Sequence, residues 1–307
     1  MKIVVLEKIT MTDKQRHRLE RLGTVEWFDS SNDDEAKART EGADVVFVDW
    51  IDPSSFILAM KSPSLVSLMS TGYEWVKNRN EARKKGILIS NIPGYATEAV
   101  AEHVIGLALC VVRQTMIGDR NIRAGKREKG YLEGIELSGK DMGVIGLGRI
   151  GKRVAEIAGS FGMNVITYNR HPKWIDNVRD VSLEELLSLS DIVAVCCSLN
   201  DSSKGMLNAK RLGLMKRDAV VVATTWDVLV LADLIPLLKA KQIRGAGLDV
   251  SIEGSNIDLP PKLFSLDNVV LTPHIGYNTV QAKERQVDIC ISNVESFLSG
   301  KPANIVN

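Results

Sequence analysis

Short apolar runs alternate with longer amphipathic segments along the first ninety residues of the chain. The runs are too short for buried helices and end in polar or glycine-containing turns, which is typical of buried strands. The segments between them repeat apolar residues at helical spacing, as at 12–22, where Gly23 is placed to cap the helix end. This alternation indicates a parallel sheet with helices on both faces. We expect strands at 3–6, 25–28, 43–48, 65–70 and 87–90, and helices at 12–22, 33–41, 54–61 and 75–85.

The pattern breaks at residues 91–95 (NIPGY), and a second set of alternating elements follows. This break is the first expected domain boundary. Thr97 is placed to cap the next helix, at 98–115, which is apolar on most faces and is therefore buried between domains or between subunits. A polar loop is expected at 118–139. Beyond it we expect strands at 164–169, 191–197, 219–224, 245–250 and 268–272, and helices at 182–189, 229–241 and 279–299.

Residues 143–151 (GVIGLGRIG) have the pattern of a buried strand, a G-x-G-x-x-G turn and the start of an amphipathic helix. Gly146 allows the tight turn, Gly148 lets a pyrophosphate approach the backbone, and Gly151 lets helix and strand pack closely. The free N–H groups and the dipole of the helix start favour phosphate. Because a second strand follows at βαβ distance, the motif predicts dinucleotide binding rather than an ordinary glycine-rich turn.

The composition argues against several classes of protein. With 39 basic and 38 acidic residues, the formal net charge of +1 gives no electrostatic basis for binding nucleic acid or a membrane surface. No apolar run reaches the length of about 18 residues that a membrane-spanning helix needs, and residues 1–7 resemble a strand and not a signal peptide. The four cysteines lie in apolar stretches without metal-ligand spacing. We therefore expect a cytoplasmic protein with no metal site and a small-molecule partner.

Five further segments resemble the D-2-hydroxyacid dehydrogenase family. They are STGY at 70–73, NIPGYATEAVAEH at 91–103, ELSGK at 136–140, GAGLDV at 245–250 and LTPHIG at 271–276. The resemblance implies an α/β fold of two doubly wound parallel-sheet domains: a Rossmann NAD(P)-binding domain at 98–279 and a discontinuous, flavodoxin-like substrate domain at 1–97 and 280–307. It also implies a homodimer formed through the cofactor domain, and an active site in the cleft between the domains. The implied reaction is reversible hydride transfer between a nicotinamide and the carbinol carbon of a 2-hydroxy acid.

The resemblance also implies roles for matching residues. His274 matches the acid/base histidine, and the backbone N–H groups of Thr71 and Gly72 match a loop that binds the substrate carboxylate. Asp249 matches an aspartate that holds the nicotinamide amide. The other implied cofactor-binding residues are Gly146, Gly148, Arg149, Ile150, Gly151, Ser198 and Gly276. The remaining histidines are interpreted as structural, namely His17, His103 and His171.

One departure from the family pattern concerns the choice of cofactor. NAD-specific members carry an acidic residue, which bonds the ribose diol, where this chain has Asn169. Asn169 removes that negative charge, and Arg170 adds a positive one. The pair favours a 2′-phosphate. We therefore expect NADP as the cofactor, with NAD as the alternative.

Two further departures concern catalysis. Trp226 stands where the family has the arginine that clamps the carboxylate and carbonyl of the keto acid, and Gly254 stands where it has the glutamate that orients the histidine. Glu253, one residue earlier, replaces that glutamate only if the loop is shortened. Two functions remain open: an oxidoreductase with an atypical substrate, in which His274, Glu253 and Trp226 form the catalytic set, or a nucleotide-binding protein that serves as a sensor or interaction partner.

Overall fold

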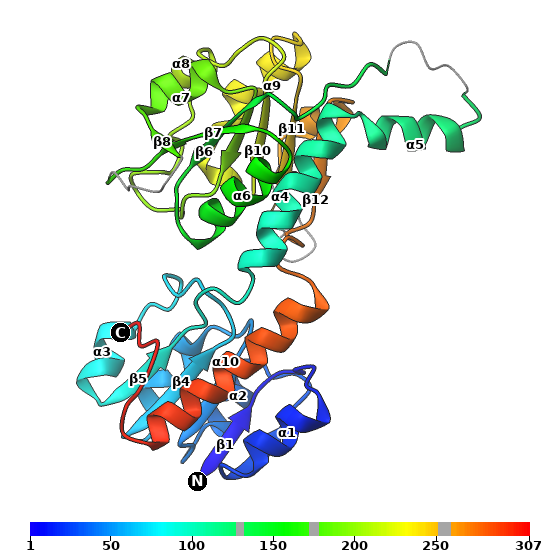
Figure 1. Cartoon of the computed structure of the whole chain (residues 1–307). Coiled ribbons are helices and arrows are strands. Elements are labelled where there is room, and N and C mark those ends of the chain that lie inside the picture. The colour runs from blue at the N-terminus through cyan, green and yellow to red at the C-terminus, as the bar shows by residue number, and fades with distance from the viewer. Residues whose placement is uncertain (127–131, 172–177, 251–258) are drawn as a thin grey trace. The chain divides into compact units, whose positions relative to one another are not determined.

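The chain folds into two compact units. The computed structural model describes residues 1–126, 132–171, 178–250 and 259–307. One unit comprises Met1–Ala96 and Asn278–Asn307, and the other comprises Thr97–Tyr277 (Figure 1). The sequence placed these boundaries at 97/98 and 279/280. Each unit is a doubly wound α/β fold, as the sequence predicted.

The discontinuous unit contains a five-stranded parallel sheet with the order β2-β1-β3-β4-β5. This flavodoxin-like order places the reversal of strand order between β1 and β3. The strands are β1 (Lys2–Val5), β2 (Thr24–Trp27), β3 (Val45–Val48), β4 (Ser64–Leu68) and β5 (Ile87–Ser90). The helices are α1 (Asp13–Glu20), α2 (Asp33–Arg39), α3 (Arg79–Lys84) and α10 (Val280–Leu298).

Helix α10 completes this unit through buried side-chain bonds to the ends of its strands. Gln286 Nε2 donates to Met69 O at 2.5 Å, and Asn293 Nδ2 donates to Asn91 O at 2.9 Å. Both side chains are at least nine-tenths buried. The last helix therefore provides polar partners for carbonyl groups that lie just beyond strands β4 and β5.

Two predicted helices of this unit differ from the structure. The segment expected as a helix at 54–61 forms two 3₁₀ turns, η1 (Pro53–Ser55) and η2 (Ile57–Ala59). The helix expected at 75–85 is reduced to α3, because the residues before it bond elsewhere: Lys77 N donates to Ser54 Oγ, and Asn78 Nδ2 donates to Ser54 O. Tertiary bonds to the 3₁₀ turn thus replace the first helical turn.

The second unit contains a seven-stranded parallel sheet with the order β12-β11-β10-β9-β6-β7-β8. Its strands are β6 (Asp141–Ile145), β7 (Asn164–Tyr168), β8 (Arg179–Asp180), β9 (Ile192–Val195), β10 (Val220–Ala223), β11 (Gly245–Asp249) and β12 (Val269–Thr272). Its helices are α4 (Thr97–Val112), α5 (Thr115–Arg123), α6 (Arg149–Ser160), α7 (Leu183–Leu189), α8 (Ala209–Leu212) and α9 (Leu231–Lys239), and its 3₁₀ turns are η3 (Trp226–Val228) and η4 (Pro261–Ser265). Separate apolar clusters fill the two faces of the sheet, one beneath α4 and α6 and the other beneath α7 and α9.

The long apolar helix expected at 98–115 is broken. Gln114 adopts a left-handed backbone conformation with φ of 55°, and α5 starts after it at an angle of 61° to α4. The sequence predicted a loop from residue 118, whereas the structure continues as α5 to Arg123. Among the described residues no single helix is long and apolar enough to cross a membrane, and only this bent pair passes that test together, by length and composition.

Candidate active site

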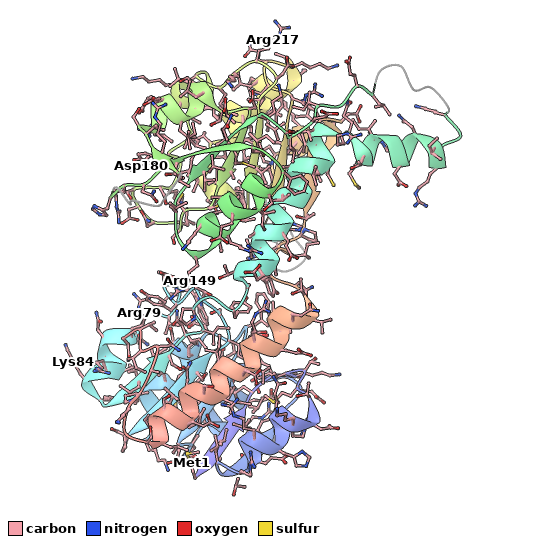
Figure 2. The ribbon with its side chains drawn as sticks, viewed as in Figure 1. Met1, Arg79, Lys84, Arg149, Asp180 and Arg217 are labelled. Carbon is pink, nitrogen blue, oxygen red and sulfur yellow. The ribbon has the colours of Figure 1, made fainter. Side chains whose placement is uncertain are left out.

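The glycine-rich turn between β6 and α6 has a separate steric reason for each glycine. Gly146 has φ of 94°, and a Cβ there would lie 2.6 Å from the Cα of Cys197. A Cβ on Gly151 would lie 2.0 Å from the carbonyl oxygen of Gly146, so the helix start packs directly against the turn. At Gly148 an added Cβ meets nothing within 4 Å, which leaves the backbone open to a ligand. Arg149 begins α6 and is exposed (Figure 2).

A cavity of about 410 Å³ lies beside this turn. It brings together five residues that the sequence assigned to the cofactor, namely Gly146, Gly148, Asn169, Arg170 and Ser198. Because β6, β7 and β9 are parallel neighbours, the loops that follow them meet at one edge of the sheet. The cavity therefore fits the phosphate and adenosine end of a dinucleotide, and the N–H groups at the start of α6 would stabilise its phosphates.

The side chains of Asn169 and Arg170 make different contacts. Asn169 Oδ1 accepts a hydrogen bond from Leu147 N at 2.5 Å, so its carboxamide ties the end of β7 to the glycine-rich turn. Arg170 Nη1 donates to Ser202 Oγ at 3.0 Å, and both side chains line the cavity. Asn169 thus has a structural contact that the sequence did not predict, whereas Arg170 offers its charge to the cavity.

Asp249, at the end of β11, is a buried carboxylate that is surrounded by donors. Thr272 Oγ1 donates to Oδ1 at 2.6 Å, Ile275 N donates to Oδ1 at 3.0 Å, and Gly276 N donates to Oδ2 at 2.9 Å. Burial acts to raise the pKa of this carboxyl, but the nearby His103 ring and these three hydrogen bonds outweigh it and lower the pKa to about 2. The carboxylate therefore stays ionised while it holds the loop after β12. Its expected contact with the nicotinamide amide stays a prediction.

His274 lies in that loop with an exposed side chain. Its φ of 52° is a left-handed conformation that is uncommon for residues other than glycine. The conformation is held on both sides, since His274 N donates to Thr272 O at 3.1 Å and Asp249 binds the next two N–H groups. The imidazole packs edge-to-face on Tyr277 at 5.7 Å between ring centroids. A strained and exposed histidine in a fixed loop suits an acid/base role.

Trp226 begins η3 shortly after the end of β10 and packs against the apolar cluster beneath α7 and α9. Its Nε1 atom is buried and has no hydrogen-bond partner within the described part of the chain. A buried N–H group without a partner costs about 1–3 kcal/mol. Glu253, the candidate partner of His274, and Gly254, which stands at the position of the family's glutamate, lie outside the described residues.

The loop of Thr71 and Gly72 follows β4 in the discontinuous unit. The carbonyl groups of both residues accept hydrogen bonds from side chains of the same unit. Asn91 Nδ2 donates to Thr71 O at 2.7 Å, and Ser70 Oγ and Trp75 Nε1 donate to Gly72 O at 2.7 and 3.1 Å. In a trans peptide the N–H group points away from the carbonyl. Holding the Thr71 carbonyl therefore directs the exposed Gly72 N–H outward, as a carboxylate-binding loop requires.

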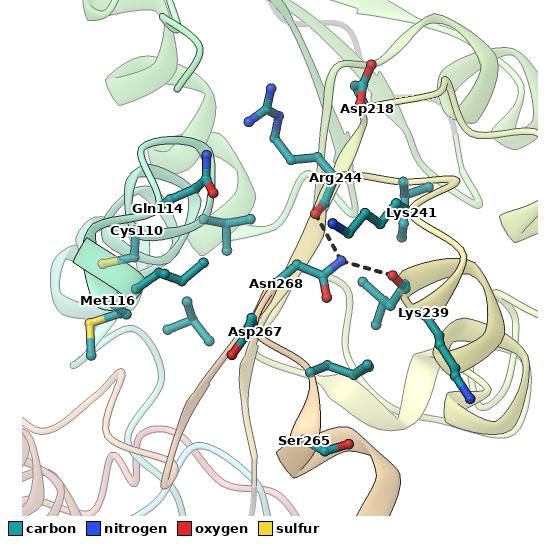
Figure 3. A pocket seen from close by; sticks show the side chains of 16 residues that line it. Cys110, Gln114, Met116, Asp218, Lys239, Lys241, Arg244, Ser265, Asp267 and Asn268 are labelled. Atoms are coloured by element: carbon teal, nitrogen blue, oxygen red, sulfur yellow. Dashed lines mark hydrogen bonds between the residues drawn. The ribbon is translucent and has the colours of Figure 1, made fainter. Parts of the chain in front are cut away.

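A second cavity, of about 380 Å³, lies at the opposite edge of the seven-stranded sheet, beside the junction of α4 and α5. Asn268 closes part of it by donating to the backbone carbonyls of Leu238 and Arg244 at 3.1 Å each (Figure 3). No residue that the sequence assigned to a site lines it. In the described ranges no group of three or more histidine, cysteine or acidic residues is placed to hold a metal ion.

Comparison with known proteins agrees with this geometry. Residues 105–276 match the model of the D-isomer specific 2-hydroxyacid dehydrogenase, NAD binding domain. A hydroxypyruvate reductase of Blautia hydrogenotrophica is 34% identical over 100% of both chains. A glyoxylate reductase of Thermofilum pendens is 36% identical over 79% of this chain and 74% of its own. Among solved structures, an acyclic imino acid reductase (Bsp5) in complex with NADPH and D-Arg matches with a TM-score of 0.89 and 31% identity over 100% of both chains.

The matched domain covers more than half of the chain and includes the glycine-rich turn, Asp249 and Gly276. The full-length similarity to the hydroxypyruvate reductase extends the relationship to the discontinuous unit. The resemblance noted in the sequence is thereby confirmed. This chain belongs to the D-isomer-specific 2-hydroxyacid dehydrogenase family and is a nicotinamide-dependent oxidoreductase.

Proposed function

We propose that the protein is an NADPH-dependent reductase of 2-imino acids, whose reacting group is a protonated C=N bond, and that it acts poorly on simple 2-keto acids. The observation that carries this proposal is Trp226 in the place of the family's arginine. An arginine supports ketone reduction because its fixed charge stabilises the oxygen that becomes negative. Tryptophan offers an apolar face and one N–H donor instead.

A protonated imine needs no such charge. It already carries a positive charge, which hydride addition removes, and a tryptophan face attracts a cation. The similarity to an imino acid reductase solved with NADPH and D-Arg supports the same substrate class and cofactor. The alternative, a nucleotide-binding sensor, would bind the cofactor without turnover.

Separate groups supply the hydride, bind the cofactor, bind the substrate and transfer the proton. The bound cofactor supplies the hydride. The glycine-rich turn and the start of α6 would hold its pyrophosphate, and Arg170 would hold the 2′-phosphate. The N–H groups of Thr71 and Gly72 would bind the substrate carboxylate. His274 would supply the proton that makes the imine nitrogen cationic before the hydride is added, or the proton that a carbonyl oxygen takes up as it is reduced.

The first prediction concerns the cofactor. Because Arg170 offers a charge-assisted contact worth about 1.5–3 kcal/mol, NADP should bind roughly ten- to a hundredfold more tightly than NAD. Titration calorimetry with both cofactors measures this ratio. Arg170→Ala should abolish the preference, while Arg217→Ala, an exposed arginine that does not line this cavity, should keep it. Equal or tighter binding of NAD by the wild type would contradict the assignment.

The second prediction concerns the substrate. NADPH oxidation should be slow with pyruvate, glyoxylate or hydroxypyruvate alone and should rise at least tenfold when methylamine is added to form the imine. Trp226→Arg should reverse this order, since an arginine restores the clamp for a keto acid. Trp226→Phe retains an aromatic face and is the matched control. Full wild-type activity on the keto acids without amine would show that another group replaces the arginine.

The third prediction concerns His274. His274→Asn should lower kcat by about a hundredfold or more, because general acid catalysis contributes on that order. The affinity for NADPH, measured by calorimetry, should stay within about twofold. His17→Asn changes an exposed histidine of α1 and should leave kcat unchanged. Near-normal turnover by His274→Asn would remove this residue from the mechanism. NADPH binding without turnover on any carbonyl or imine would favour the sensor.

The fourth prediction concerns assembly. Helix α5 has no buried residue, and Met116 and Ile122 are 55% and 68% exposed. We infer that a second copy of the chain covers α5, because this helix presents apolar side chains that the described part of its own unit leaves uncovered. Light scattering should then report a dimer, and Ile122→Asp should dissociate it. Val280→Asp, an equally exposed apolar residue on α10, should leave the dimer intact. A monomeric wild type would refute the inference.

A further inference from the structure

We propose that His103 is a positioning residue that fixes the catalytic loop through Thr272 and Asp249. Its place in an apolar helix predicts only a structural histidine. The inference rests on the proposed function to the extent that His274 is the acid/base residue. It adds a residue from α4, a different element of the same unit, to the machinery around His274.

The hydrogen bonds from His103 through Thr272 to Asp249 form a continuous series in which each group donates towards Asp249. His103 Nε2 lies 3.0 Å from Thr272 Oγ1, and Thr272 Oγ1 lies 2.6 Å from Asp249 Oδ1. A threonine hydroxyl has one proton, and the ionised Asp249 can only accept it. Thr272 Oγ1 must therefore accept from the other side, so His103 carries a proton on Nε2. His103 Nε2 is also 3.6 Å from Asp249 Oδ1, which adds an electrostatic contact beyond hydrogen-bond range.

The far end of this chain holds the backbone beside the catalytic histidine. Asp249 receives its last two hydrogen bonds from Ile275 N and Gly276 N, the two residues that follow His274. Gly276 is closely packed, since a Cβ added to it would lie 2.9 Å from Asp249 Oδ2 and 3.3 Å from His103 Cδ2. A substitution at His103 should therefore affect the loop both through the Thr272 hydroxyl and through the close packing beside Gly276.

Helix α4 is a rigid support for this chain. His103 is 20% exposed at the side chain, and its neighbours on α4 belong to the apolar cluster on that face of the sheet. The helix approaches β11 so closely that a Cβ on Gly247 would lie 2.9 Å from the Cβ of Leu107. An imidazole fixed on such a helix cannot follow a displaced loop. His103 is thus suited to define where the loop sits.

The experiment compares His103→Ala, His103→Gln and Thr272→Val with the wild type. The first readout is hydrogen exchange of the Ile275 and Gly276 amides in the protein without added ligand. His103→Ala should speed this exchange at least tenfold while exchange within β11 is unchanged. The glutamine variant places an amide N–H near the position of Nε2 and should restore protection. His17→Ala, an exposed histidine whose ring contacts Asp13 O, is the matched control.

The second readout is kinetic, with glyoxylate plus methylamine and NADPH as the probe. His103→Ala should lower kcat about ten- to a hundredfold with KM within twofold, as expected for misplacement of a catalytic group. Combined with Thr272→Val it should lower kcat no further than the more severe single variant, because both act through one chain of contacts.

The outcomes separate this inference from the function it rests on. Unchanged amide exchange, or unchanged kcat, in His103→Ala would overturn the role of His103 even if His274→Asn is inactive. Loss of activity that His103→Gln fails to restore would also overturn it, since it would indicate packing and not the N–H donor. If His274→Asn is fully active, or if the wild type shows no turnover with the probe, the proposed function fails first, and the positioning role fails with it.

Discussion

A single buried carboxylate organises the carboxyl edge of the seven-stranded sheet. Asp249 and Thr272 are paired in register at the ends of β11 and β12, so one hydrogen bond joins the two strand ends and two more capture the loop beyond them. Because donors on several sides lower its pKa to about 2, the folded form keeps the charge that the loop requires. The stabilisation linked to this shift is complete above the ordinary carboxyl pKa and is lost only as the pH falls towards 2.

The candidate site depends on the direction of the strands. All strands of each sheet are parallel, so every strand of a unit delivers its following loop to the same edge. Residues that are far apart in the sequence, but lie at or just beyond the ends of strands, are thereby brought to the same edge of the sheet. No local sequence pattern links them. In the second unit the residues that follow strands are Gly146, Asn169, Ser198, Trp226 and His274, and Asp249 is itself the last residue of β11.

The alternation of apolar and polar segments was sufficient to predict both sheets, because strand and helix periods are local properties of the chain. It failed where tertiary bonds compete with helix formation, as at the 3₁₀ turns around Ser54, and where one backbone angle at Gln114 divides a helix. The motifs identified the strand-end residues but not what those residues touch. Asn169 was assigned to the cofactor and bonds the glycine-rich turn. The positioning role of His103 has no sequence signature, because its partners come from a distant strand and loop.

The return of α10 to the first unit has a consequence for how the chain is made. When Ala96 leaves the ribosome, the five strands of that unit have been synthesised, but the helix that binds Met69 O and Asn91 O lies beyond 181 residues of the other unit. At about 5–20 residues per second, translation of that intervening unit takes roughly ten to forty seconds. Throughout that interval the nascent five-stranded sheet lacks the helix that covers it. The second unit, although later in the sequence, is the first that can fold to completion during synthesis.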